Sequence, residues 1–569
     1  MPPARALHVI FCWHMHQPDY RDADGFYTLP WTYLHACKDY ADMVGHYEEN
    51  PLARGVFNFV PILVEQLEDY TAQFQSGQFR DPLLIALATE DLKAALSNEQ
   101  RHFLLEQCFR LDHEHMLTPF PPYRRLHEIY QLMLEDVTEI ADYLSVQYIA
   151  DLLVWYHLAW TGETVRRGSP LLQSLFAKGR GFSQEDRRQL VAFLGELIAG
   201  LIPRYRALAE AGRIEISSTP YYHPIGPLLL DFTAAREAVA DAPLPACPAY
   251  PGGAERARWH IERAQNSHSP HFGVPAQGMW PAEGGLSAAF LEMLGSAGVR
   301  WTASGEGVLA HSLLLSEDDS APRGRAEYLY RPYQLQGQGP ALFFRDDALS
   351  DTIGFDYKTW LGHDAVTDFI HKLEAIWRQT EHEENPVVSV ILDGENAWEY
   401  YPYNGYYFLS DLYKSLANHP HIQMCTFSDF VSRYPGGIKS IPRLAAGSWV
   451  YGSFSTWIGE AAKNRAWDLL CAAKQDVDQH IGQFPAEQQA RILEQLGRCE
   501  GSDWFWWLGD YNPSDSVRDF DHLYRLNLRK LYTLMQIPAP DNLSEPISHG
   551  GGAAEAGGTM RRTHAKDTE

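Results

Sequence analysis

The sequence of 569 residues predicts an α/β fold in which parallel strands and helices alternate around a barrel-like sheet. From about residue 213 to residue 430, short apolar runs of strand length alternate with longer amphipathic runs of helical length. In addition, the run 387–392 (VVSVIL) has no charge and four β-branched residues, as is typical of a strand buried on both faces. Acids and aromatics follow that strand directly, where barrel enzymes carry their chemistry.

The individual elements follow from local patterns in chain order. Residues 86–210 have few strand candidates and are expected to form a helical insertion. Its clearest helix, at 183–212, begins with a capping box of Ser183 and Asp186 and stops at Gly212. Strands are predicted at 7–13, 56–60, 213–219, 278–280, 299–304, 387–392 and 422–428, and helices at 255–265, 286–298, 364–382 and 406–419.

Three segments follow from this pattern. Residues 1–440 are expected to form the barrel. Only helical patterns appear after about residue 455, which predicts a C-terminal helical domain at 441–539 that completes the cleft of the barrel. Residues 540–569 are rich in glycine, alanine and polar residues and are expected to be disordered.

The bulk composition restricts the partners. A net charge of −26 argues against nucleic acid and anionic membranes, and it suits a neutral or cationic ligand better than a phosphorylated one. The 16 Trp, 30 Tyr and 26 Phe residues suit flat partners such as sugars, although large cores explain them equally well. Seven dispersed cysteines without a CxxC pair, no signal-peptide cleavage site and no membrane-length apolar run predict a cytoplasmic protein. The oligomeric state is unknown.

Histidines follow the first predicted strand in HMHQP (14–18). His14 and His16 are two apart and therefore face the same way. Two convergent imidazoles can bind zinc or hydrogen-bond to substrate hydroxyls, but ordinary buried histidines are an equally good interpretation. As a zinc site the pair is incomplete; His223 or Asp393 could supply a third ligand, but no spacing requires it.

Carboxylates follow two other predicted strands. Glu283 lies in GMWPAEGGLS, where glycines and Pro281 favour a sharp turn, and Asp393 and Glu395 follow the strand at 387–392. Cleavage of a glycosidic bond needs such a pair, because one carboxyl protonates the leaving oxygen while the other attacks the sugar or activates water. Glu283 could instead only stabilise the next helix N-terminus. Spacing alone does not choose between Asp393 and Glu395.

Other candidates carry weaker signals. Arg345 stands beside two aspartates, so salt bridging within the site is favoured over direct substrate contact. His223 lies between Pro220 and Pro224 in a loop that the prolines fix. Tryptophans at 454–467 and 502–511 suit either a sugar platform or packing between the barrel and the helices.

Five segments, taken in order, resemble glycoside hydrolase family 57: HMHQP (14–18), YYHPI (221–225), WPAEG (280–284), LDGENAWE (392–399) and STWIGE (455–460). The resemblance implies an incomplete (β/α)7 TIM-like barrel followed by a helical domain. It also implies a retaining mechanism with Glu283 as nucleophile and Asp393 as acid/base, so that Glu395 supports the reaction. The substrate-binding positions implied by the matched segments are His14, His16, Gln17, His223, Trp280, Trp398 and Trp457, with Arg345 as a further candidate. No metal or cofactor is expected.

The resemblance implies hydrolysis of α-1,4-glucans such as starch, glycogen or maltodextrin, since the first and last segments look like those of amylase and amylopullulanase members. A 4-α-glucanotransferase or branching-type transglycosylase on the same site is the alternative. Two other classes remain open: a metal-dependent deacetylase-like enzyme using His14 and His16, and a non-catalytic glucan-binding protein.

Overall fold

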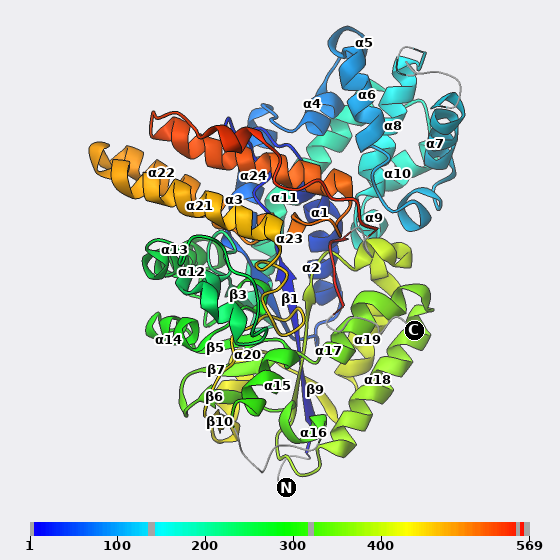
Figure 1. The fold of residues 1–569 in the computed structure, drawn as a ribbon. Helices are drawn as coiled ribbons and strands as arrows, with labels where there is room; N and C mark the ends of the chain where they lie inside the picture. The colour runs from blue at the N-terminus through cyan, green and yellow to red at the C-terminus, as the bar shows by residue number, and fades with distance from the viewer. Residues whose placement is uncertain (1–4, 135–140, 142, 317–323, 554–557, 563–569) are drawn as a thin grey trace.

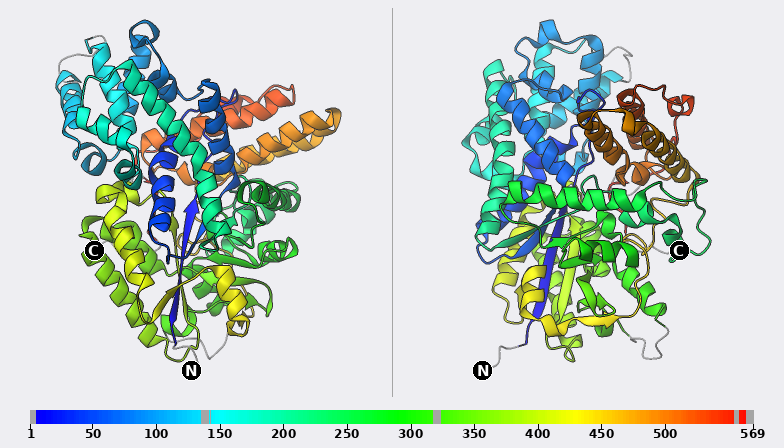
Figure 2. Two further views of the ribbon diagram at one scale, coloured as in Figure 1. Left: turned by 180° about the vertical axis from the view of Figure 1, so that it is seen from behind. Right: turned by 90° about the vertical axis from the view of Figure 1, so that its left-hand side faces the viewer.

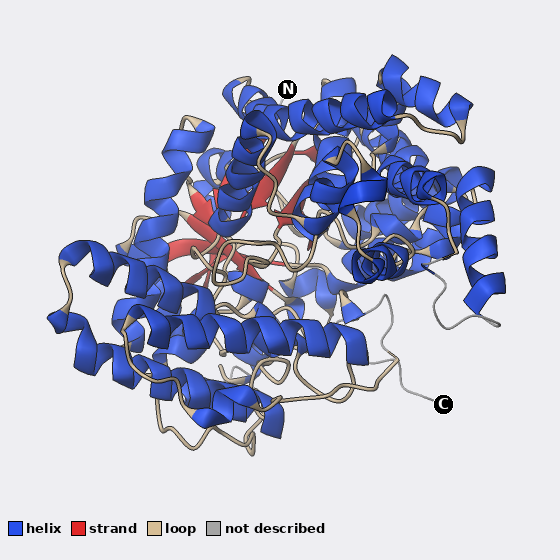
Figure 3. Ribbon diagram, turned by 90° about the horizontal axis from the view of Figure 1, so that it is seen from above, coloured by secondary structure: helices blue, strands red, loops and turns tan. Residues whose placement is uncertain are grey.

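The computed structural model describes residues 5–134, 141, 143–316, 324–553 and 558–562. Its centre is a curled sheet whose strands follow the order β10-β6-β7-β5-β4-β3-β2-β1-β8, with β9 beside the start of β1. The neighbouring strands are parallel except for β6 and β7. Seen from above in Figure 3, helices surround the sheet. The strands are β1 (Leu7–Met15), β2 (Gly55–Phe59), β3 (Ile214–Ser218), β4 (Gly278–Met279), β5 (Trp301–Ser304), β6 (Tyr333–Leu335), β7 (Gln338–Phe344), β8 (Val387–Asp393), β9 (Ile422–Met424) and β10 (Lys439–Ile441).

The helices fall into three groups along the chain. The first group is α1 (Trp31–His35), α2 (Ala41–Glu49), α3 (Pro61–Ser76), α4 (Pro82–Ala88), α5 (Leu92–Ala95), α6 (Asn98–Gln107), α7 (Pro121–Leu134), α8 (Val146–Ala159), α9 (Glu163–Gly168), α10 (Pro170–Lys178) and α11 (Gln184–Glu210). The second is α12 (Gly226–Leu230), α13 (Gly253–Phe272), α14 (Ala288–Ser296), α15 (Glu306–Leu314), α16 (Arg325–Tyr328), α17 (Asp347–Asp351), α18 (Gly362–Gln379), α19 (Tyr406–Ala417) and α20 (Phe427–Arg433). The third is α21 (Ala461–His480), α22 (Ala486–Cys499), α23 (Asp503–Trp507) and α24 (Ser514–Leu534).

The curled sheet closes into a barrel at a narrow seam between β7 and β8. Immediately after β7, Arg345 forms a parallel bridge with Ser389 of β8, and the N–H of Asp346 donates to the Ser389 carbonyl at 2.8 Å. Seven parallel strands, β1–β5, β7 and β8, thus enclose one interior. The predicted incomplete (β/α)7 barrel with a helical insertion and C-terminal helices is confirmed.

Alternation along the strands decides which side chains fill the barrel. Ile10 and Cys12 of β1 point inward and form an interior cluster with inward residues of other strands, including Phe343 and Ile391. Phe11 and its alternating neighbours point outward against the helices. The same parity, continued to the carboxyl ends of the strands, brings polar residues into the barrel in place of apolar ones: His14, Asn58, Arg345 and Asp393. The sequence pattern therefore builds an apolar barrel floor and a polar mouth.

Both sets of added helices lie at the end of the barrel toward which β1 points (Figures 1 and 2). The insertion helices α4–α10 occupy one side of that end and α21–α24 occupy the other. Glu500, directly after α22, attaches the C-terminal helices to α13, because its buried carboxylate accepts hydrogen bonds from Arg256 at 2.8 Å and His260 at 2.7 Å. Burial disfavours the charged form of Glu500, but the charges and hydrogen bonds of Arg256 and His260 together outweigh that cost and lower its pKa to about 2. The domain limits at 440 and 539 remain predictions.

Local signals account for element ends. Ser183 Oγ accepts the N–H of Asp186 at 3.2 Å, so α11 has the predicted capping box, and Gly212 follows that helix with a φ of 66°. The predicted strand at 422–428 is shorter in the structure. β9 ends at Met424, because Thr426 caps α20 by accepting the N–H of Asp429 at 3.1 Å.

Parts of the C-terminal segment that was expected to be disordered have described positions, namely residues 540–553 and 558–562. The N–H groups of Gly551 and Gly552 both donate to the Asn512 carbonyl at 3.0 Å, and the N–H of Ile547 donates to Asp521 of α24 at 2.7 Å. Composition misses such contacts because the partners belong to other segments. For residues 554–557 and 563–569, the expectation lies outside the described residues.

Within the described ranges, no helix is both long and apolar enough to cross a membrane.

Candidate active site

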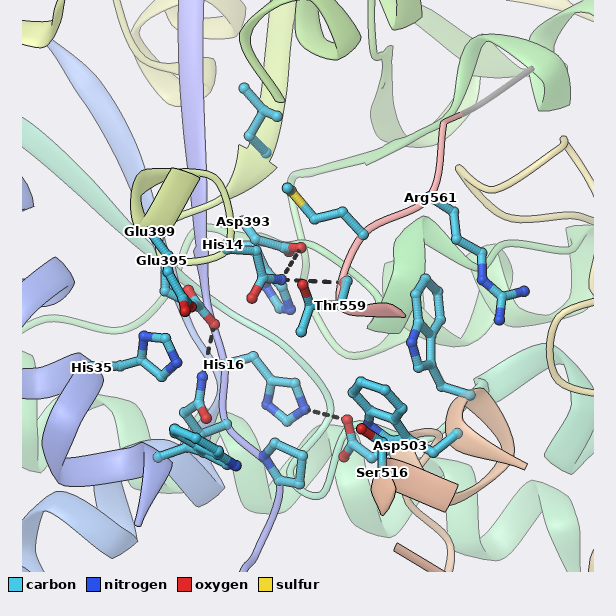
Figure 4. A pocket seen from close by; sticks show the side chains of 18 of the residues that line it. His14, His16, His35, Asp393, Glu395, Glu399, Asp503, Ser516, Thr559 and Arg561 are labelled. Carbon is cyan, nitrogen blue, oxygen red and sulfur yellow. Dashed lines mark hydrogen bonds and ion pairs between the residues drawn. The ribbon is translucent and has the colours of Figure 1, made fainter. Parts of the chain in front are cut away.

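A cavity of about 450 Å³ opens at the carboxyl ends of the barrel strands. Figure 4 shows side chains from several segments pointing into it. The barrel contributes the acids Glu283, Asp393, Glu395 and Glu399 and the histidines His14 and His16. Aromatic rings from the insertion (Trp160), from the segment after β10 (Trp449) and from the C-terminal helices (Trp506, Trp507 and Phe520) complete the wall. Acids set among aromatic rings suit an uncharged, hydroxyl-rich ligand.

Asp393 is the last residue of β8 and lies beside His14 of β1 in the parallel register. Neighbouring strands are about 4.8 Å apart, so the two side chains enter the cavity side by side. Asn396 Nδ2 donates a hydrogen bond to Asp393 Oδ2 at 2.7 Å. Burial outweighs this hydrogen bond and raises the pKa of Asp393 to about 6.

Glu283 reaches the cavity from a turn that follows β4. Its φ of 57° lies in the left-handed region, which a glutamate rarely adopts, and Gly284 follows at 61°. Hydrogen bonds hold the turn: the N–H of Trp449 donates to the Glu283 carbonyl at 3.0 Å, and Ser304 Oγ donates to the Gly284 carbonyl at 2.6 Å. The indole Nε1 of Trp449 also donates to Glu283 Oε2 at 2.9 Å.

The two carboxyl groups share one environment. Burial and the negative charge of Asp393 raise the pKa of Glu283 to about 8, although the hydrogen bond from Trp449 favours its ionised form. Because the other pKa is about 6, the pair holds one proton between these two pH values. One ionised and one protonated carboxyl facing the same cavity can act as nucleophile and proton donor.

A chain of hydrogen bonds fixes the tautomers of two histidines. Asn58 Nδ2 donates to the Ser218 carbonyl at 2.7 Å, so its Oδ1 faces His14 and accepts from Nδ1 at 2.7 Å. His14 Nε2 is then an acceptor for His223 Nε2–H at 3.1 Å, and His223 Nδ1 accepts from Ser502 Oγ at 2.9 Å. Burial lowers the pKa of His14 to about 3, and that of His223 well below its usual value, which keeps both rings neutral.

The model of glycosyl hydrolase family 57 matches residues 10–440. The chain belongs to this family. Three solved structures share its fold. A family 57 branching enzyme from the archaeon Thermococcus kodakaraensis is 15% identical with a TM-score of 0.57, over 93% of this chain and 90% of the other. A branching enzyme of the same type from Pyrococcus horikoshii is 14% identical (TM-score 0.56; 99% and 100%), and the α-amylase AmyC from Thermotoga maritima is also 14% identical (TM-score 0.54; 94% and 93%). No curated protein matches. Family membership makes the chain an enzyme of the glycoside hydrolase class.

His16 lines this family 57 cavity, whereas His223 does not line it and packs behind His14 and His16. The rings of His16 and His223 stack at 3.9 Å between centroids, and His16 Nε2 donates to Asp503 Oδ1 at 2.8 Å (Figure 4). The ligand atoms of these two histidines and Asp503 lie within 4.8 Å of one another, the spacing of a candidate metal group. Each nitrogen facing Asp503 already has a hydrogen-bond partner in the described residues. The expected absence of a metal remains a prediction.

Arg345 and Gln17 line the cavity as supports of the acids. The Arg345 guanidinium donates to Asp347 at 2.9 Å, to Asp351 at 2.8 Å and to the Ile391 carbonyl at 2.8 Å, so it bridges β7 and β8 as well as facing the cavity. Gln17 Nε2 donates to Glu395 Oε1 at 3.2 Å. Burial raises the pKa of Glu395 well above its usual value, which favours the protonated form of this side chain. A protonated Glu395 adds no negative charge beside Asp393.

The three predicted tryptophans lie behind the cavity wall rather than in it. Trp280 packs edge-on against Trp449, the residue that donates to Glu283, at 5.3 Å between centroids. Trp398 packs against Trp13 at 5.8 Å, and its Nε1 donates to the Gly394 carbonyl at 2.9 Å, which fixes the turn after Asp393. Trp457 lies 5.9 Å from Trp506, which does line the cavity. Their direct contact with a sugar remains a prediction; in the structure they buttress residues that do face the cavity.

Among the cavity residues outside the predicted positions, Asn396, Trp449, Asp503 and Arg561 interact with the predicted acids or with His16. Asn396 and Asp503 stand in segments that the sequence singled out, one beside Asp393 and the other within the tryptophan-rich run. Trp449 and Arg561 lie in irregular segments, where no periodicity indicates which side chain turns inward.

Proposed function

We propose that the enzyme acts on α-1,4-linked glucans by a retaining mechanism, with Glu283 as nucleophile and Asp393 as acid/base. The observation that carries this proposal is that both carboxyls face one cavity, where Trp449 Nε1 donates to Glu283 and Asn396 Nδ2 donates to Asp393. The aromatic wall supports a sugar ligand, and the solved structures with the same fold bear the names of α-glucan-active enzymes.

In the first step Glu283 attacks the anomeric carbon, and the bond to the leaving sugar breaks as that oxygen takes the proton of Asp393. In the second step an O–H oxygen attacks the same carbon, the ester to Glu283 breaks, and the proton passes to Asp393. The microstate required has the proton on Asp393, whereas the order of the two pKa values favours a proton on Glu283. A glycosidic oxygen that accepts a hydrogen bond from Asp393, and positive charge at the anomeric carbon, both favour the productive arrangement.

The histidines suit the binding of the reacting sugar. His14 is neutral, with its tautomer fixed, beside Asp393, and His16 is oriented by Asp503. Both ring nitrogens of His14 already have protein partners, whereas His16 Nδ1 has none among the described residues, so His16 is the ring that can exchange a hydrogen bond with a sugar hydroxyl.

Whether water or a second glucan takes the glycosyl group separates an amylase-like hydrolase from a 4-α-glucanotransferase or branching enzyme. Incubation with maltoheptaose tests this, with reducing ends and chain lengths measured together. Shorter chains with new reducing ends indicate hydrolysis, and longer chains at constant reducing ends indicate transfer; a new α-1,6 signal in the proton NMR spectrum indicates branching. No turnover of maltoheptaose, starch, pullulan or glycogen would reject the proposed function.

A further inference from the structure

The described residues 558–562, here called the strap, run across the cavity wall at the C-terminal end of the chain. Thr559, Met560 and Arg561 line the cavity, and only 9% of Met560 is exposed. Figure 4 shows Thr559 close to Asp393, with Arg561 farther along the same segment. No matched family segment lies here, since the family model ends at residue 440.

On one side the strap is attached to the C-terminal helices. The Nε1 of Trp506 in α23 donates to the Gly558 carbonyl at 2.9 Å. The guanidinium of Arg561 stacks on Trp506 at 4.7 Å and on Tyr511 at 4.3 Å from the ring centroids. The rings of Trp506 and Tyr511 therefore hold the planar guanidinium of Arg561 in place beside the cavity.

On the other side the strap is attached to the barrel. Arg562 donates to Asp356 Oδ1 at 3.0 Å and lies over the ring of Phe355, which itself lines the cavity. Asn396 Nδ2, which hydrogen-bonds to Asp393, also lies 3.5 Å from the Thr559 carbonyl. The strap therefore joins both walls and contacts the residue that orients Asp393.

We propose that the strap closes the cavity around the glycosyl-enzyme and directs the glycosyl group to a sugar acceptor rather than to water. This inference rests on the proposed function and concerns its second step. The bonds formed and broken are the same for both acceptors, so selection depends on which O–H group can reach the anomeric carbon. A segment fastened to both walls reduces the access of bulk water, while a glucan held by the aromatic wall keeps its place.

Arg561 has a second effect through its charge. It lines the same cavity as Glu283, as do Asp393 of β8, Asp503 of α23 and Trp449, whose indole N–H donates to Glu283. Arg561 lowers the pKa of Glu283, whereas both aspartates raise it. Arg561 is thus a positioning residue that favours the ionised nucleophile.

The test compares four forms of the full enzyme with maltoheptaose: the unchanged chain, a deletion of 558–569, a deletion of 563–569, and Arg561→Ala. The deletion of 558–569 is expected to reduce the ratio of transfer to hydrolysis by about tenfold, and Arg561→Ala by about threefold. The deletion of 563–569 is the matched control, since it keeps the strap, and its ratio is expected to stay unchanged. Melting temperatures identify any loss of folding, and Arg561→Ala still tests the proposal if the larger deletion does not fold.

The pH profile separates the strap's charge from simple packing. Arg561→Ala is expected to shift the acidic limb of the kcat/KM profile to higher pH, and Arg561→Lys is expected to restore the limb but not the full transfer ratio, because lysine keeps the charge without the planar stacking. If the deletion of 558–569 and Arg561→Ala both keep activity and an unchanged ratio of transfer to hydrolysis, the strap proposal is overturned and the proposed function stands. A native enzyme that only hydrolyses also overturns the strap proposal. Absence of all turnover overturns both proposals.

Discussion

Glu283 and Asp393 face the same cavity from two different kinds of backbone. Asp393 ends a regular buried strand whose register places it beside His14. Glu283 stands in the left-handed region after a strand of two residues, in a turn held by Trp449 and Ser304. The strand positions one carboxyl through the general geometry of a parallel sheet, while the other depends on a few specific hydrogen bonds. We therefore expect the Glu283 side of the site to be the more sensitive to changes in its surroundings.

The largest expected effect separates the roles of the two acids. Glu283→Gln and Asp393→Asn are each expected to reduce activity on maltoheptaose by about 10⁴-fold or more. With an aryl glycoside whose leaving group needs no proton, Asp393→Asn should still release a burst of phenol, since the nucleophile remains, whereas Glu283→Gln should not. Stopped-flow absorbance measures the burst. A burst in Glu283→Gln alone would exchange the two roles.

A second prediction concerns stability and its dependence on pH. The carboxyl of Glu283 has its usual pKa of 4.5 in the unfolded state and a pKa of about 8 in the folded state. As the pH rises between these values, the unfolded state loses this proton first. The free energy of unfolding therefore falls over this range. Glu283→Gln removes this loss of stability. The variant is expected to match the native enzyme near pH 4 and to exceed its free energy of unfolding by roughly 4 kcal/mol near pH 8.

Urea unfolding at the two pH values measures this difference. Asp393→Asn, as the comparison, should gain stability over a lower window, from the usual pKa of 3.8 to about 6. Equal gains for Glu283→Gln at both pH values would contradict the raised pKa of Glu283.

A third prediction addresses the turn itself. A Cβ at Gly284, where φ is 61°, would lie 2.7 Å from Cη2 of Trp280, so Gly284→Ala is expected to cost about 2–3 kcal/mol and to lower activity by moving Glu283. Gly212→Ala is the matched control, because Gly212 has a similar φ of 66° with nothing within 4 Å, and about 1 kcal/mol is expected there. Thermal unfolding and kcat measure both effects. Equal losses of stability in Gly284→Ala and Gly212→Ala would show that the positive φ alone, and not the contact with Trp280, makes Gly284 necessary.

The smallest change in activity is expected from the loss of one hydrogen bond, between Trp449 and Glu283. Trp449→Phe removes the Nε1 donor at 2.9 Å from Glu283 Oε2 and keeps most of the ring, so the pKa of Glu283 should rise further and kcat/KM near neutral pH should fall by about tenfold. The pH profile of kcat/KM measures the shift. An unaltered profile would mean that the hydrogen bond does not favour the ionised nucleophile.

The same contrast explains what the sequence could predict. Strand alternation is a local property, so the apolar run 387–392 and the His-x-His spacing placed Asp393, His14 and His16 correctly in the fold, although roles came only from the resemblance. The glycines and proline around Glu283 predicted a turn but not its direction. Trp449 and Arg561 reach the cavity from irregular segments, where the inward side chain is chosen by tertiary contacts. The number of tryptophans could not separate rings that face the cavity from rings that pack behind it, because a large aromatic side chain suits both positions.

The seam between β7 and β8 has a further consequence for how the barrel moves. In the described chain one β-bridge, between Arg345 and Ser389, joins the backbones of these strands, with hydrogen bonds from the Asp346 amide to Ser389 and from the Arg345 guanidinium to the Ile391 carbonyl. Native-state hydrogen exchange should therefore find the Asp346 amide opening more readily than the amides within β8, by local fluctuation rather than by global unfolding. Local opening at this seam would therefore loosen the strand ends that carry Arg345 and Asp393, which both line the cavity.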